Sequence, residues 1–140
     1  MNLKLRLISK FRELFLPHYR SLEFRAKIFS AMLMAKKEPS EKDFDTIEKI
    51  GKEIYSDDEK RAKILVFLVK EYLQKSKIYK NYTIDVVLKE IDSELRSVKR
   101  YAKKIDFEHL RRLISQDDED EALLQQRIYE FLVNEVKIYL

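Results

Sequence analysis

The sequence contains no cysteine, a single glycine, two prolines and no tryptophan among its 140 residues. The lack of cysteine excludes disulfides, thiolate metal sites and cysteine nucleophiles, and it fits a reducing compartment. Phosphate-binding loops, dinucleotide-binding motifs and nucleophile elbows each need several glycines for tight turns and close backbone approach. Because Gly51 stands alone, the sequence excludes those nucleotide-binding and hydrolase families.

Long hydrophobic runs are also missing. The longest covers residues 64–69, far short of the roughly 20 residues that a helix needs to span a bilayer. Charges interrupt the apolar pattern of the N-terminal segment, so a secretory signal peptide is not expected there. We therefore expect a cytoplasmic protein, with peripheral attachment to the inner face of the membrane as the alternative.

The composition is that of one folded domain. A chain of this length normally forms a single domain, and its 45% apolar residues can form a core without disulfides or a metal. Charged residues make up 39% of the chain, against about 25% in an average domain. Residues 1–140 are accordingly expected to form one unit.

Apolar residues recur at helical spacing throughout the chain, and no strand pattern appears. The fold class that this predicts is all-α: a single compact domain of about seven helices, of the helical-bundle type. The expected helices are 3–16, 22–36, 44–54, 59–73, 84–102, 107–115 and 122–139.

Helix start signals support these boundaries. Ser40 to Asp43 approximates a capping box, Ser56 to Glu59 matches one fully, and Thr83 can cap the helix that follows it. The run 64–69 is apolar on every side, which predicts a helix at the centre of the domain. A buried strand is the alternative for so short a run, and the helix start signal before it together with residues 70–75 after it favours the helix.

One predicted helix has a seam with a 3.5-residue period. Its members are Ile84, Leu88, Ile91, Leu95, Val98 and Ala102. The last helix, 122–139, is the expected partner of this seam within the domain. Pairing with a second copy of the chain, which would give a homodimer, is the alternative.

The stretch from Phe24 to Leu73 resembles the TerB-like family, which includes tellurite-resistance TerB and the N-terminal part of DjlA-type co-chaperones. The matching segments are 25–35, 38–44 and 47–50. In that family a helix ends in Ala-Asp-Gly, and a short turn leads to Ser or Thr with several acids at the start of the next helix. The resemblance implies a helical fold for this part of the chain.

The chain departs from the family at the turn itself. The family's acidic turns are associated with divalent metals, but Lys36 and Lys37 stand where the family carries Asp-Gly. Two ammonium groups repel a cation by Coulomb's law. Glu38, Glu41 and Asp43 keep a metal site open as an alternative. We expect no metal and no cofactor.

Residues that carry out catalysis are sparse. His18 and His109 have no second histidine at ligand spacing, which disfavours zinc. No pair of carboxylates lies in a segment that the sequence identifies as an apolar pocket, so acid–base chemistry has no specific support. The sequence therefore predicts a protein that is not an enzyme.

Charge is unevenly distributed along the chain. Residues 1–37 hold nine Lys or Arg and two Glu, a net of +7, whereas residues 117–140 hold two basic and seven acidic residues, a net of −5. A basic face beside an apolar stripe suits in-plane binding to anionic lipid, and it equally suits a helix packed on the domain. The candidate contacts to an anionic surface are Lys4, Arg6, Lys10, Arg12, Lys36 and Lys37.

Two further basic segments contain tyrosines. Residues 75–82 and 99–104 interleave lysine or arginine with tyrosine, a pattern found in proteins that bind single-stranded nucleic acid. Cations near the ends of helices also complement the helix dipole without any ligand. Nucleic acid is therefore a less favoured partner.

The hypothesis that these observations favour is a non-catalytic, TerB-like accessory domain that acts through protein–protein contact, in a stress- or envelope-associated system. The alternative is a protein that binds anionic surfaces, either lipid or nucleic acid, through its basic N-terminal half.

Overall fold

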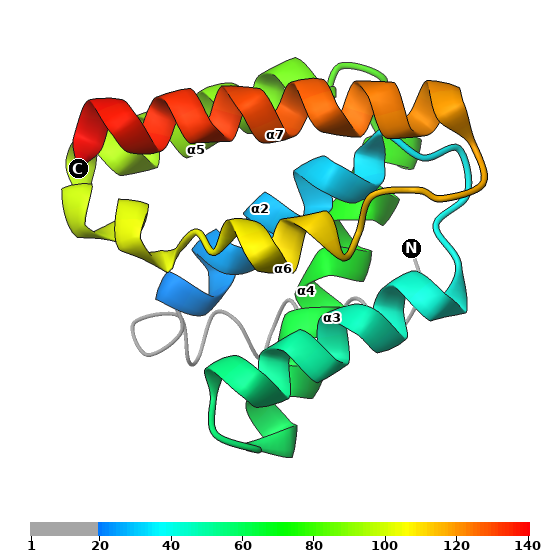
Figure 1. The fold of residues 1–140 in the computed structure, drawn as a ribbon, viewed down its shortest axis with the longest axis horizontal. Helices are drawn as coiled ribbons and strands as arrows, with labels where there is room; N and C mark the ends of the chain where they lie inside the picture. The colour runs from blue at the N-terminus through cyan, green and yellow to red at the C-terminus, as the bar shows by residue number, and fades with distance from the viewer. Residues whose placement is uncertain (1–19) are drawn as a thin grey trace.

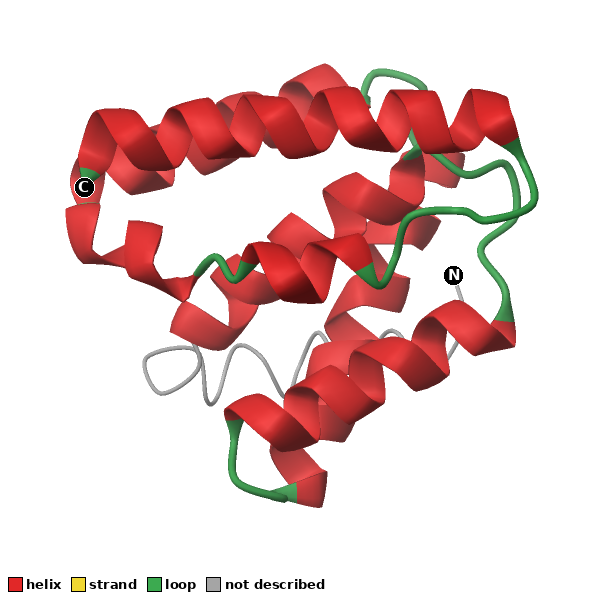
Figure 2. Cartoon of the chain, viewed as in Figure 1, coloured by secondary structure: helices red, strands yellow, loops and turns green. Residues whose placement is uncertain are grey.

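The computed structural model describes residues 20–140, which form helices joined by short loops (Figure 1). The elements are α2 (Arg20–Met34), α3 (Glu41–Ile54), α4 (Glu59–Ile78), α5 (Ile84–Ser97), the 3₁₀ helix η2 (Lys99–Lys104), α6 (Phe107–Arg111) and α7 (Glu119–Tyr139). Within this part of the chain there is no strand, so the all-α prediction is confirmed (Figure 2). The helix expected at 3–16 lies outside the described residues.

Two of the predicted helix starts are confirmed. Ser40 is the N-cap of α3, and its backbone N–H donates to the carboxylate of Asp43 over 2.8 Å while its hydroxyl accepts from the Asp43 N–H. Thr83 caps α5 by accepting from the N–H of Val86. These local contacts satisfy amides that have no partner inside the helix, which is why sequence alone located them.

The capping box expected at Ser56 is wrong. The N-cap of α4 is Asp58, whose carboxylate accepts from the N–H of Arg61. Ser56 and Asp57 instead have φ angles of 55° and 64°, in the left-handed region, where they reverse the chain between α3 and α4. An N-cap needs extended backbone, so a residue in this turn cannot serve as one.

The centre of the domain is α2 rather than the predicted α4. Helix α2 packs against α4, α5, α7 and η2, and its side chains Phe24, Met32 and Leu33 are fully buried. Helix α4 packs mainly on α2 and α3. It buries Leu65, but Phe67 from the same apolar run is only half-buried.

The single helix predicted over 84–102 is wrong, because α5 ends at Ser97 and the chain continues as η2. The six residues of the predicted seam nevertheless all lie in the core or pack against it. Ile91 and Leu95 are buried as expected, whereas Leu88 is half-buried. The change of helix type carries Tyr101 to the core, where its ring lies 4.9 Å from that of Phe24. Packing over long sequence separation therefore sets the end of α5.

Helices α5 and α7 lie side by side and run in the same direction, with η2, α6 and a loop returning the chain between them (Figure 1). Tyr139 near the end of α7 donates to the carboxylate of Asp92 on α5 over 3.0 Å. The predicted partnership between the two helices is thus present, although α5 packs more extensively on α2 than on α7. None of the described helices is both long and apolar enough to cross a membrane.

Candidate functional site

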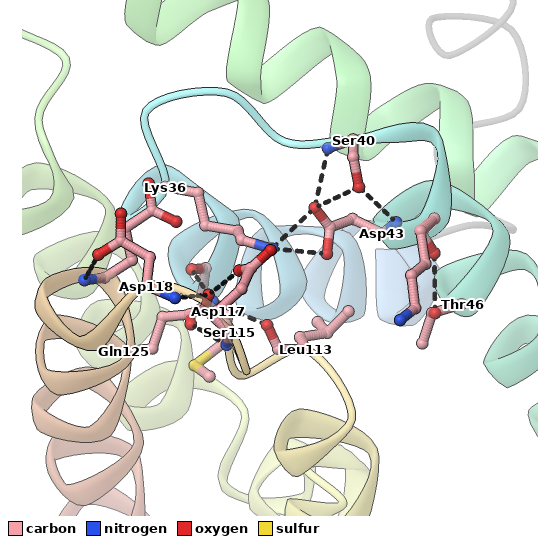
Figure 3. Close-up of polar contacts among 12 residues, drawn as sticks. Lys36, Ser40, Asp43, Thr46, Leu113, Ser115, Asp117, Asp118 and Gln125 are labelled. Atoms are coloured by element: carbon pink, nitrogen blue, oxygen red, sulfur yellow. Dashed lines mark hydrogen bonds and ion pairs between the residues drawn. The ribbon is translucent and has the colours of Figure 1, made fainter.

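The turn between α2 and α3 contains Lys36 and Lys37, the two lysines on which the expectation of no metal rested. Figure 3 shows Lys36 and Asp43 pointing toward one another across this turn. The Lys36 ammonium donates to both carboxylate oxygens of Asp43 at 3.0 Å, and both side chains are mostly buried. The lysine therefore places its own positive charge at the one buried carboxylate of the turn.

The remaining acids of the turn do not assemble around this carboxylate. Glu38 and Glu41 are exposed, and they belong to no group of metal-ligating side chains in the part of the chain that the structure describes. Asp43 already accepts hydrogen bonds from Lys36 and from Ser40. These contacts use the oxygens that a hard cation would need.

Of the six residues predicted to contact an anionic surface, only Lys36 and Lys37 lie in the part of the chain that the structure describes. Lys37 is exposed, and its backbone N–H donates to Glu121 at the start of α7. Lys36 is largely buried against Asp43, so its ammonium faces the turn. The other four candidates, Lys4, Arg6, Lys10 and Arg12, lie outside the described residues.

A buried amide fastens three segments of the chain next to this turn. The Gln125 side chain donates to the carbonyls of Met32 and Leu113 at 3.1 and 2.9 Å and accepts from the N–H of Ser115 at 2.8 Å (Figure 3). The side chain of Gln125 is completely buried, and each of its hydrogen bonds is to backbone. Gln125 therefore has a structural role, and it fixes α7 relative to the end of α2.

The acidic run 117–121 forms the start of α7. Asp118 is the N-cap and accepts from the N–H of Glu121 over 3.0 Å. Three further acids lie in the first turn, where the positive end of the helix dipole favours them. The cap and the helix dipole therefore account for the position of these acids without any ligand.

A pair of carboxyl groups lies between α5 and α7, and sequence reasoning missed it. Burial, together with a hydrogen bond to Asp92, raises the pKa of Glu135 to about 7. The hydrogen bond from Glu135 and a second one from Tyr139 lower the pKa of Asp92. One oxygen of Glu135 is buried without a hydrogen-bond donor, which disfavours the charged carboxylate relative to the protonated acid.

A cleft of about 340 Å³ opens where the start of α2, the end of α3, the end of η2 and α6 meet. It is lined by Arg25, Glu53, Ile54, Lys103, Lys104, Asp106 and His109. At its edge, the Arg112 guanidinium bridges Glu53 on α3 and Glu108 on α6. The hydrogen bond from Arg112 lowers the pKa of Glu53.

The described residues contain one group that could hold a metal ion, formed by Asp106, Glu108 and His109, whose ligand atoms lie within 4.8 Å of one another. Sequence reasoning missed it because it searched for a second histidine. Glu108 is engaged by Arg112, and Asp106 caps α6 by accepting from the Glu108 N–H. These contacts oppose a cation at this place.

The tyrosines of the two basic segments are mostly used inside the fold. Tyr82 is buried, and its hydroxyl donates to Glu90. The Nζ of Lys75 lies 4.1 Å from the centre of the Tyr82 ring. Tyr101 packs against Phe24 in the core. Tyr79 is 57% exposed and is the remaining tyrosine of these segments. One exposed ring offers little stacking surface for successive bases.

Large apolar side chains are exposed along α7. Leu124 is 38% exposed and Ile138 67% exposed, with the half-buried Phe131 midway between them. Seven residues are close to two helical turns, so these three side chains lie on one side of the helix. We call them the α7 apolar stripe.

Neither a protein-family model, nor a curated protein, nor a solved structure matches this chain. The class of protein that the fold defines is therefore the compact all-helical domain of residues 20–140. The likeness to the TerB-like family continues to rest on residues 24–73 alone.

Proposed function

We propose that the chain is a non-catalytic helical interaction domain that binds a protein partner in the cytoplasm, with the α7 apolar stripe as its contact surface. The observation that carries this proposal is the exposure of Leu124 and Ile138 on one side of a helix. Moving a large aliphatic side chain out of water contributes about 1.5–3 kcal/mol. A partner that covers Leu124 and Ile138 would gain part of this free energy for each, because they are 38% and 67% exposed in the free domain.

The stripe is also held rigidly, which favours binding. Gln125 and the Asp118 cap fix the first half of α7, and the contacts of Tyr139 with Asp92 fix its end. A surface that is ordered before association loses little conformational entropy when the partner binds. Charged and polar residues such as Arg127 adjoin the stripe, as in the rims of protein interfaces.

Substitutions on α7 test the proposal. The double variant Leu124→Glu/Ile138→Glu adds two charges to the stripe, and the control Gln126→Glu/Asn134→Glu adds two at exposed polar positions of the same helix. Each immobilised protein is used to capture partners from native lysate, and captured proteins are quantified by mass spectrometry. We expect the stripe variant to lose a partner that wild type and control retain, with circular dichroism unchanged. A partner retained equally by all three would contradict the assignment of this surface.

The resemblance to TerB-like proteins suggests the kind of cellular system in which the domain works. The likeness falls on α2, α3 and α4, and it suggests an accessory domain of a stress- or envelope-associated system. The pairing of Lys36 with Asp43 supports a version of this domain that works without a metal in the turn.

The second candidate function is binding to an anionic surface. It is supported by the net charge of +4, by the +7 of residues 1–37 and by the exposed Lys37. The test is retention on vesicles that contain phosphatidylserine, at ionic strengths of about 0.05 and 0.5 M. One variant replaces Lys4, Arg6, Lys10 and Arg12 with alanine. The control variant replaces four exposed lysines of α3, α4 and α5 with alanine: Lys42, Lys49, Lys63 and Lys89.

Salt-sensitive retention that disappears only in the N-terminal variant would support this second function. Retention that falls equally in both variants would indicate a non-specific effect of net charge, and lack of retention at low salt would exclude the function.

A further inference from the structure

The cleft between α2, α3, η2 and α6 has cationic groups with unused hydrogen-bonding capacity. Arg25, from the second turn of α2, lines it. One guanidinium nitrogen, Nη1, donates to the hydroxyl of Tyr55 over 3.1 Å, and the guanidinium carbon lies 5.4 Å from the centre of the Tyr55 ring. These contacts hold the guanidinium group in place.

The Nε of Arg25 is buried and has no hydrogen-bond acceptor. A buried donor that loses its water without gaining a partner costs about 1–3 kcal/mol, and more when the group is charged. The free donor edge of a guanidinium matches two oxygens of a phosphate or carboxylate. An anion that entered the cleft and reached this edge of Arg25 would supply the missing acceptor.

Lys103 and Lys104, at the end of η2, add two positive charges to the same cleft. Neither forms an ion pair with any residue between 20 and 140. The two acids of the cleft are engaged, because Arg112 holds Glu53 and Asp106 caps α6. The three cations of the cleft also outnumber its two acids, so the net charge that faces a ligand is positive.

We propose that this cleft binds the phosphate group of a small organic phosphate. Arg25 donates to two phosphate oxygens, and Lys103 and Lys104 contribute point charges from the end of η2. The volume of about 340 Å³ is at the lower end of the range for small-molecule sites, which suits a phosphate with a small organic group attached. A metal ion at Asp106 and His109 would face three cations in the same cleft, and Coulomb repulsion opposes it.

The test measures binding of inorganic pyrophosphate and of glycerol 3-phosphate by isothermal titration calorimetry on the full chain. The variants are Arg25→Lys, which keeps the charge and removes the planar donor edge, and Lys104→Gln. The matched control is Lys99→Gln, because Lys99 lies on the same 3₁₀ helix and does not line the cleft. Wild type should bind both phosphates, and Arg25→Lys and Lys104→Gln should each weaken binding about tenfold. The control should bind like wild type.

Other outcomes overturn the proposal. If Lys99→Gln and Lys104→Gln weakened phosphate binding equally, the affinity would depend on the net charge of the protein and not on this cleft. Binding to vesicles that contain phosphatidic acid, without binding of the soluble phosphates, would mean that the positive charge of the cleft serves to bind a membrane surface instead of a small phosphate. Binding of Zn²⁺ alone, lost in His109→Ala, would make the cleft a metal site. Arg25→Lys removes a contact with Tyr55 and can therefore unfold the domain. If Arg25→Lys unfolds, the effect of Lys104→Gln on phosphate binding decides whether the proposal holds.

Discussion

Replacing Glu135 with glutamine should flatten the dependence of stability on pH. In the folded protein the pKa of Glu135 is raised to about 7 by burial and by its hydrogen bond to Asp92, against an ordinary value of 4.5. A group with a raised pKa contributes stability that is fully present below its unfolded pKa and is lost as the pH rises through its folded pKa. The free energy of unfolding should therefore fall between pH 4.5 and about pH 7.

The size of this effect follows from the shift. At about 1.4 kcal/mol per pKa unit, a shift from 4.5 to about 7 corresponds to roughly 3 kcal/mol. The pKa of Asp92 is lowered, so its contribution is lost only as the pH falls below the ordinary carboxyl range, outside this window. The glutamine amide of the Glu135→Gln variant resembles the protonated acid and can donate to Asp92 at every pH.

Urea unfolding, followed by far-UV circular dichroism at about pH 5 and about pH 8, measures the effect. The free energy of unfolding of wild type should be about 2–3 kcal/mol lower at pH 8 than at pH 5. For Glu135→Gln, the difference between the two conditions should be less than about 1 kcal/mol. Glu130→Gln, an exposed substitution on the same helix, should behave like wild type. If Glu135→Gln showed the same pH dependence as wild type, the raised pKa of Glu135 would be refuted.

Three further substitutions test the packing, all by urea unfolding at neutral pH. Gly51→Ala should destabilise by about 1 kcal/mol, because its Cβ would lie 3.0 Å from the backbone of α4 and this crowding outweighs the gain in helix propensity; equal or higher stability would contradict it. Gln125→Met should lower the free energy of unfolding by about 3 kcal/mol, because it leaves three buried backbone groups without partners. The exposed control Gln126→Met should lower it by less than about 0.5 kcal/mol. Lys36→Met should cost about 1–2 kcal/mol, and a double-mutant cycle with Asp43→Asn should give a favourable coupling energy; additive effects would mean that the ion pair does not stabilise the turn.

Sequence reasoning succeeded where the signal is local. The caps at Ser40 and Thr83 were predictable because a side-chain oxygen satisfies an amide only three residues away. The failure at Ser56 has a matching cause. The same residue types also occupy left-handed turns, and the close approach of α3 to α4 at Gly51 decides which conformation is adopted.

The features of the candidate sites depend on contacts between distant residues. Glu135 lies 43 positions after Asp92, and Arg112 lies 59 positions after Glu53, so no spacing pattern could bring either pair together. The end of α5 was missed for the same reason, since the 3.5-residue period continues through η2 while Tyr101 turns into the core. The charge of Lys36 and Lys37 was visible in the sequence, but the burial of Lys36 against Asp43 was not.

The hydrogen bond from Gln125 to the carbonyl of Met32 spans 93 positions, which has a consequence for how the protein is made. Helix α2, the centre of the core, leaves the ribosome long before α7 exists to cover it. At about 5–20 residues per second, the interval is roughly 5–20 seconds. During this time the side of α2 that α7 later covers is open to solvent, and chaperones that shield apolar segments can bind it. A chain stalled before Glu119 would therefore be a target for proteases rather than a shorter, working form of the domain.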